Sequence, residues 1–311
     1  LEKPMETIPL FSEVESADLV TELNPKFIFR KEELETYLTH LKPKNNNIAI
    51  VDSEKSLTYA EVYNLILMLD KKLKRIGAYK GMKICFFGVR SWQQVVIFYL
   101  CLLKNYVYVP IDSKHSKNRL VDVVSELKPD LILSSDEYFD DELEVIEVNS
   151  LFDDNISSEI LVKNPCNNHV IDLAYILFTS GTTGKPKGVQ ISRSNLAHFA
   201  STYKRDWYFE KGWRSSFLTS ISFDASIMEM MSALSLGNSL HIFSDEYQNL
   251  PNFINENKIE SIIITPSLYS ILDFSKCENL KLVISGGDKF RKNNTIPQTT
   301  RVVNGYGPTE G

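Results

Sequence analysis

The sequence lacks the features that define several large classes of protein. It has only four cysteines, which are Cys85, Cys101, Cys166 and Cys277. They make no CxxC pair, and the five histidines form no metal-ligand pattern near them, which argues against a disulfide scaffold or a zinc site. No stretch approaches the roughly 18 uninterrupted apolar residues of a membrane span, and the start LEKPMETIPL lacks the pattern of a signal peptide. We therefore expect a soluble, cytoplasmic protein with buried free thiols and no membrane partner.

The chain also lacks an excess of basic charge. The chain has 34 Lys and Arg against 40 Asp and Glu, for a net charge of -6, and it contains no long basic run. Nucleic acid is therefore not an expected partner. No internal repeat or low-complexity tract is evident. What the chain does have is length and apolar content, because 311 residues that are 43% hydrophobic can bury more than one core.

Helix and strand signals alternate along the chain. Thr58 and Glu61 form a capping box before a helical apolar pattern, which predicts a helix over 59–76, and Ser91 and Gln94 offer a second capping box. Further helices are predicted at 117–127, 194–204 and 225–236, and strands at 82–88, 106–111, 130–134, 215–219, 239–243, 260–265, 281–285 and 300–304. Such alternation favours parallel sheets flanked by helices.

This pattern predicts an α/β protein of two stacked subdomains with mostly parallel sheets. We place the first subdomain at 31–150 and the second at 151–311, after a linker-like segment at 1–30. The acidic, Asn-rich residues 135–169 are expected to form an edge strand and surface loops near the joint, which falls between about 135 and 175.

The run TSGTTGKPKGV at 179–189 is typical of a phosphate-binding loop. It places three glycines, four hydroxyls and two lysines directly after the apolar run AYILF. Glycine lets backbone amides approach an anion, and the lysines supply charge. The spacing is not that of a Walker A loop, and Pro186 indicates that no helix opens at Lys185. The alternative is a solvated connector between two strands.

Three motifs in order resemble those of the adenylate-forming superfamily, which activates carboxylic acids with ATP as acyl-AMP and pyrophosphate. They are the loop at 179–189, FDAS at 223–226 and NGYGPTEG at 304–311. Three weaker matches, LTYAEV at 57–62, YVPID at 108–112 and a connector-like stretch at 7–24, are similar to the adenylation domains of nonribosomal peptide synthetases. The second of these departs from the family pattern, since Asn105 and Tyr106 stand where small residues are usual.

The resemblance implies a nucleotide site made of both glycine-rich motifs. Its members would be Thr179, Ser180, Gly181, Thr182, Thr183, Gly184, Lys187, Gly286, Asn304, Gly305, Tyr306, Gly307 and Thr309. By the same resemblance Lys187, Thr309 and Glu310 would serve catalysis, with Thr309 on the α-phosphate and Glu310 on Mg²⁺, a cation that suits a carboxylate. Tyr306 would stack on adenine and Asn304 would meet its amine. Without the resemblance, GYGPTEG is a Pro/Gly turn and Lys187 a surface lysine.

The resemblance also implies a substrate pocket in which Asp224 pairs with an α-ammonium group. The matching positions are Asp224, Ala225, Met228, Ile263, Val283, Ser285 and Gly305. They are mostly apolar with small members, which suggests a medium or large, mainly uncharged side chain. Two alternatives stay open: Asp224 as the N-cap of a helix that starts near Ala225, and the larger apolar residues as ordinary core.

The expected function is therefore activation of an amino acid as aminoacyl-AMP. The cofactors would be ATP and Mg²⁺, with phosphopantetheine on a peptidyl carrier protein as acceptor, and a condensation domain as neighbour. The family's C-terminal lid, with its lysine, and its ribose-binding aspartate match no residue of this sequence. Two rival hypotheses are a stand-alone ligase or acyl-CoA synthetase of the same superfamily, and a lid-less, non-catalytic nucleotide-binding module.

Overall fold

The structure is a computed structural model. It describes residues 33–114, 117–135, 144–153, 172–180, 186–292, 295–307 and 309. By their contacts the residues divide into one unit at 1–32 and another at 33–311. The predicted linker at 1–30 and the loop residues 181–185 lie outside the described residues, and everything below concerns the unit at 33–311.

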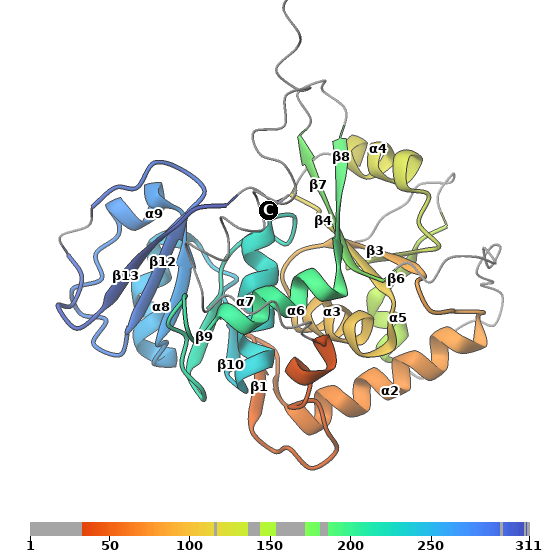
Figure 1. Cartoon of the computed structure of the whole chain (residues 1–311), viewed down its shortest axis with the longest axis horizontal. Coiled ribbons are helices and arrows are strands. Elements are labelled where there is room, and N and C mark those ends of the chain that lie inside the picture. The colour runs from red at the N-terminus through yellow and green to blue at the C-terminus, as the bar shows by residue number, and fades with distance from the viewer. Residues whose placement is uncertain are drawn as a thin grey trace, which may run out of the picture. The chain divides into compact units, whose positions relative to one another are not determined.

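One sheet of the described chain has six strands in the order β6-β5-β3-β4-β7-β8 (Figure 1). Its strands are β3 (Lys83–Gly88), β4 (Val107–Asp112), β5 (Leu131–Ser134), β6 (Ile146–Glu147), β7 (Leu173–Ser180) and β8 (Pro186–Ser192). All neighbours are parallel except β7 and β8, which form an antiparallel pair. The predicted edge strand after residue 135 is β6.

The other sheet has seven strands in the order β13-β12-β11-β9-β10-β1-β2. Its strands are β1 (Ile48–Val51), β2 (Ser56–Thr58), β9 (Arg214–Phe217), β10 (Ser239–Ile242), β11 (Ser261–Ile264), β12 (Leu282–Gly286) and β13 (Arg301–Gly305). Only β1 and β2 are antiparallel neighbours. Two mostly parallel sheets with helices on their faces confirm the predicted fold class.

The helices follow the sequence signals closely. They are α2 (Tyr59–Arg75), α3 (Trp92–Lys104), α4 (Lys117–Leu127), α5 (Val148–Phe152), α6 (Arg193–Thr202), α7 (Asp224–Leu236), α8 (Leu250–Asn257) and α9 (Pro266–Ile271), with 3₁₀ turns η2 (Leu34–Tyr37) and η3 (Tyr247–Asn249). The Thr58 and Glu61 capping box at the start of α2 is confirmed. The second box forms only by half, because Ser91 accepts from the Gln94 backbone while the Gln94 side chain is buried elsewhere.

Each sheet contains strands from distant parts of the sequence. Strand β1, from the early part of the sequence, pairs with β10 and carries β2 on its other side, whereas β7 pairs with β4 and carries β8 on its other side. The predicted boundary at residue 150 therefore does not coincide with the division between the sheets. Where the subdomains divide stays a prediction.

Helix α7 is fixed between the two sheets by buried tyrosines. Figure 1 shows α3, α6 and α7 in this middle layer. Tyr99 of α3 donates a hydrogen bond to the Met230 carbonyl (3.0 Å), and Tyr59 of α2 donates to the carbonyls of Ala233 (3.0 Å) and Asn238 (2.7 Å). These bonds satisfy hydroxyls that would be costly to bury alone. They hold a helix whose first residue is Asp224.

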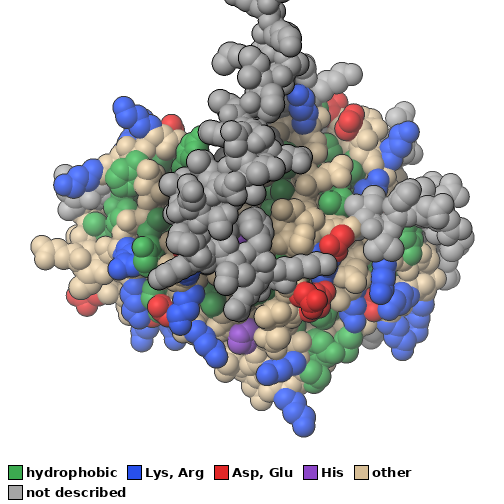
Figure 2. Space-filling model, in the orientation of Figure 1, with side chains coloured by type: hydrophobic (Ala, Val, Ile, Leu, Met, Phe, Trp, Pro, Cys, Tyr) green, Lys and Arg blue, Asp and Glu red, His purple; other side chains and the backbone are tan. Residues whose placement is uncertain are grey.

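The surface and the thiols agree with the sequence interpretation where the structure describes them. Figure 2 shows basic and acidic side chains interspersed on the face that it draws. Cys85, Cys101 and Cys277 are buried free thiols, and burial raises the pKa of Cys85 to about 12. Cys166 lies outside the described residues. Among the described helices, none is long and apolar enough to span a membrane.

Candidate functional site

The Asp224 carboxylate lies at the N-terminus of α7. The helix begins at Asp224 itself, and its N-cap is Phe223, which makes no side-chain cap bond. One Asp224 oxygen accepts from the Ala225 amide at 2.7 Å, and the other accepts from the Thr309 hydroxyl at 3.1 Å. The N-cap alternative is therefore wrong for Asp224. Its place in the first turn suits a carboxylate, because the helix dipole favours negative charge there.

Asp224 is also close to the strand that leads into the phosphate loop. Burial raises the pKa of Tyr175 on β7, and the negative charge of Asp224 raises it further. Tyr175 belongs to the six-stranded sheet and α7 follows a strand of the other. The carboxylate is thus near enough to the six-stranded sheet for its charge to act on Tyr175.

The predicted phosphate loop joins the two strands of an antiparallel hairpin. Thr179 on β7 lies opposite Lys187 on β8, and Ser180 opposite Pro186. Lys187 is exposed and lies on the strand β8, whereas Lys185, where no helix was predicted to open, lies outside the described residues. The predicted ligands Gly181, Thr182, Thr183 and Gly184 lie outside the described residues.

Two glycines bring β12 and β13 unusually close at the other motif. Gly286 lies opposite Gly305, and a Cβ added to Gly286 would lie 2.6 Å from the Gly305 carbonyl oxygen. Beyond Gly305 the chain is open: Tyr306 is 95% exposed, and a Cβ on Gly307 would meet nothing within 4 Å. The Tyr306 ring and the Gly307 backbone are therefore accessible to a flat ligand. Glu310 lies outside the described residues.

The predicted pocket residues divide between the two faces of the seven-stranded sheet. Ile263 lies opposite Ile284, and both pack with Met228 in one hydrophobic cluster. Val283 is next to Ile284 in sequence, so it points to the other face and packs in a second cluster. Ser285 alternates with Ile284 in the same way, as Asn304 does with Gly305.

The structure therefore groups Asp224, Ala225, Met228, Ile263 and Gly305 on the side that faces α7, and it adds Ile284. Val283 and Ser285 are not brought to that group. Both are fully buried, and the Ser285 hydroxyl has no hydrogen-bond partner. Their assignment to the substrate pocket stays a prediction that this arrangement does not support.

Glu229 is a buried carboxyl that the sequence interpretation missed. It is 2% exposed on α7 and accepts from the backbone amides of Leu218 (2.9 Å) and Thr219 (3.1 Å) and from the Thr219 hydroxyl. Burial raises its pKa to about 7. These bonds hold the chain just after β9, which runs on to Phe223 and Asp224. The signal in the sequence was a single acidic residue, Glu229, within the otherwise apolar part of α7.

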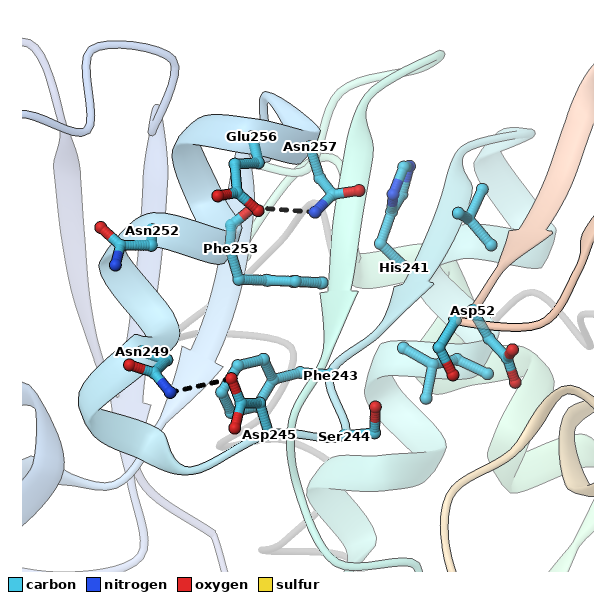
Figure 3. A pocket seen from close by; sticks show the side chains of 13 residues that line it. Asp52, His241, Phe243, Ser244, Asp245, Asn249, Asn252, Phe253, Glu256 and Asn257 are labelled. Carbon is cyan, nitrogen blue, oxygen red and sulfur yellow. Dashed lines mark hydrogen bonds between the residues drawn. The ribbon is translucent and has the colours of Figure 1, made fainter.

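A separate pocket of about 350 Å³ lies between α8 and the ends of β1 and β10 (Figure 3). Asp52, His241, Asp245 and Asn257 are among the side chains that line it. None of the predicted site residues does. His241 is 7% exposed, and Ser239 pairs with its Nε2 at 3.0 Å.

His241 is expected to make stability depend on pH. Burial lowers its pKa from 6.5 to about 4, so between these values the unfolded chain binds a proton that the folded chain does not. The contribution is complete above pH 6.5 and is lost as the pH falls toward 4. Between pH 7 and 5, wild type should lose on the order of 2 kcal/mol of unfolding free energy relative to His241→Gln.

Urea unfolding of both proteins at pH 7, 6 and 5 measures this difference. The exposed His198→Gln is the matched control, and it should follow wild type at every pH. Parallel curves for wild type and His241→Gln would show that the His241 pKa is not lowered by folding.

The chain belongs to the family of AMP-binding enzymes, which it matches over residues 39–311. Within that family its relatives include nonribosomal peptide synthetases. It is 30% identical over 284 residues to nonribosomal peptide synthetase GRA1 of Gibberella zeae, covering 89% of this chain and 4% of that protein. It is 28% identical over 280 residues to malpinin synthetase of Mortierella alpina, covering 85% of this chain and 4% of that protein. The chain thus spans a small fraction of the length of these relatives.

Solved structures share its fold. The complex of VinN with L-aspartate superposes with a TM-score of 0.76 at 20% identity, covering 90% of this chain and 78% of that one. The nonribosomal peptide synthetase FmoA3 in its AMPPNP-bound form superposes with a TM-score of 0.74 at 21% identity, covering 96% of this chain and 34% of that one. The resemblance to the adenylate-forming superfamily is therefore confirmed, and the chain is homologous to its peptide-synthetase branch.

Proposed function

We propose that this chain activates an α-amino acid with ATP, releasing pyrophosphate and forming aminoacyl-AMP for nonribosomal peptide synthesis. The observation that carries the proposal is the 3.1 Å hydrogen bond between Thr309 and Asp224. One of these residues is the predicted contact of the α-phosphate, and the other is the predicted partner of the substrate's ammonium group. They come from motifs far apart in sequence and meet at one point.

That meeting point suits the reaction. The substrate's carboxylate must attack the α-phosphorus, and its ammonium group lies on the adjacent carbon. An enzyme that fixes the ammonium beside the α-phosphate therefore also fixes the attacking oxygen, and positioning of this kind supplies much of the rate. Asp224 offers the countercharge for the ammonium, and pairing in a half-buried site offsets the cost of desolvating both groups.

The remaining described residues fit a nucleotide. Lys187, exposed on β8 beside the loop, would supply positive charge to the phosphates, where charge develops as pyrophosphate leaves. The exposed Tyr306 ring would stack on adenine, and the bare Gly307 backbone leaves room for it. Mg²⁺, for which Glu310 is the predicted ligand, would neutralise phosphate charge when bound.

The aminoacyl group would then pass to the phosphopantetheine thiol of a peptidyl carrier protein, with a condensation domain as neighbour, in the cytoplasm. The peptide-synthetase relatives support these partners. The apolar surroundings of Met228, Ile263 and Ile284 support a substrate with an uncharged side chain.

Exchange of labelled pyrophosphate into ATP tests the proposal. The full chain, with Mg²⁺, is assayed against single amino acids and against aryl and fatty acids. We expect exchange with one or a few amino acids. Exchange with non-amino acids alone would favour the acyl-CoA synthetase hypothesis, and ATP binding without any exchange would favour a non-catalytic nucleotide-binding module.

A further inference from the structure

The loop at 203–209 lies along β13, the edge strand that carries the second nucleotide motif. Strand β13 ends the order of its sheet. At its start, the Arg301 guanidinium lies 4.0 Å from the centre of the Tyr208 ring. At its end, a Cβ added to Gly305 would lie 3.2 Å from Cζ3 of Trp207. The loop therefore contacts both ends of β13.

The backbone of this loop holds an unfavourable conformation. Tyr208 has a φ of +62°, which is rare for a bulky residue and persists only where the surroundings fix it. The cation–π contact with Arg301 and the hydrogen bond from the Phe209 amide to the Tyr203 carbonyl, 3.0 Å long, fix it here. The position of the neighbouring Trp207 is thereby determined.

Trp207 lies on the pocket side of the sheet. The same added Cβ on Gly305 would lie 3.4 Å from Cγ2 of Ile284, and Ile284 lies opposite Ile263. Ile263 and Met228 belong to the cluster against which Trp207 packs. The indole and Ile284 thus both lie against the position of Gly305, with Ile263 on the strand next to Ile284.

An aromatic row connects Trp207 to the neighbourhood of Asp224. Phe199 makes edge contacts with Trp207 and with Tyr203, at ring-centre distances of 6.3 and 5.1 Å. Tyr203 is fully buried, and Tyr175 adds to the rise that burial causes in its pKa, as Asp224 does for the pKa of Tyr175. The ring contacts therefore lead from Trp207, beside Gly305, to Tyr203, which lies within electrostatic range of Tyr175.

We propose that Trp207 determines the specificity of the amino-acid pocket by filling the space that Gly305 leaves open, so that the pocket accepts an aliphatic and excludes an aromatic side chain. The inference rests on the proposed function. A glycine at this position would by itself widen the pocket, but the indole occupies that volume. The side chains shown near the indole, Ile284 and Phe199, are apolar, which favours an uncharged substrate side chain against it.

Specificity of the full chain for aliphatic and aromatic amino acids tests the assignment. We expect Trp207→Ala to raise the ratio of kcat/KM for aromatic over aliphatic substrates at least tenfold, because pocket volume alone discriminates by about 10- to 200-fold. The control is Trp213→Phe, just before β9 and beside Lys281, which should keep the wild-type ratio. An unchanged ratio in folded Trp207→Ala overturns the assignment.

A second measurement does not depend on turnover or on the alanine variant folding. The chain has three tryptophans, and the accepted amino acid should change their fluorescence through Trp207. Trp207→Phe should abolish that change, while Trp213→Phe keeps it. A full change in Trp207→Phe would overturn the assignment alone. If wild type shows neither exchange nor a fluorescence change with any amino acid, the proposed function fails, and the assignment with it.

Discussion

Replacement of Asp224 by Asn is expected to lower amino-acid-dependent pyrophosphate exchange by about two to three orders of magnitude, since a hydrogen-bonded charge pair of this kind is worth about 3–5 kcal/mol when one partner is lost. Asparagine has nearly the same shape: its amide oxygen can still accept from the Ala225 amide, and its NH2 group can donate to the Thr309 hydroxyl in place of accepting from it. What it lacks is the negative charge that pairs with the substrate's ammonium group. ATP affinity should therefore stay near wild type.

Exchange kinetics and ATP titration of the same preparation separate these two effects. Asp245→Asn is the matched control, since Asp245 is exposed and lines the other pocket, and it should leave both quantities unchanged. Wild-type exchange by Asp224→Asn would remove the carboxylate from substrate binding. Loss of ATP affinity together with exchange would mean that Asp224 organises Thr309 and does not pair with the amine.

The regular elements could be predicted because their signals are local. Caps and apolar periods set the bounds of α2, α4 and α7 to within two residues. Strands β1 and β2 gave no such signal, since both are short and β1, which pairs with β2, joins the sheet by pairing with β10, far along the chain. Gln94 shows the same limit within a helix: it could close a capping box, but a buried hydrogen bond to the Tyr108 hydroxyl takes its side chain instead.

The pocket was harder to predict than the fold because its strands are buried on both faces. In β12 the run Leu282–Ile284 is apolar throughout, so the sequence has no alternation to show which residues face α7. The pairing register of β12 with β11 and β13 decides which residues face α7, and those strands lie elsewhere in the sequence. A shift of one residue exchanges Ile284 for Val283 and Ser285. Trp207 gave no signal either, since its neighbours Phe199 and Gly305 are brought to it by the fold and not by the local sequence.

Replacement of Gly286 by Ala is expected to separate β12 from β13 and to weaken both stability and ATP binding. The added methyl would lie 2.6 Å from the Gly305 carbonyl oxygen, and a backbone atom cannot move away as a flexible side chain can. Overpacking of this kind costs about 1–3 kcal/mol. Because β13 leads directly to Tyr306 and Thr309, its displacement should also raise the Kd for ATP at least tenfold.

Urea unfolding and ATP titration of Gly286→Ala measure the two effects, and Ser285→Ala is the control for stability. That change also alters one atom on β12, but it removes a fully buried hydroxyl with no partner, so the unfolding free energy should be unchanged or higher. A destabilised Gly286→Ala that still binds ATP normally would separate the strand contact from the nucleotide site. Normal stability and normal binding together would mean that β13 can shift without cost, and that the two glycines do not hold the second motif in place.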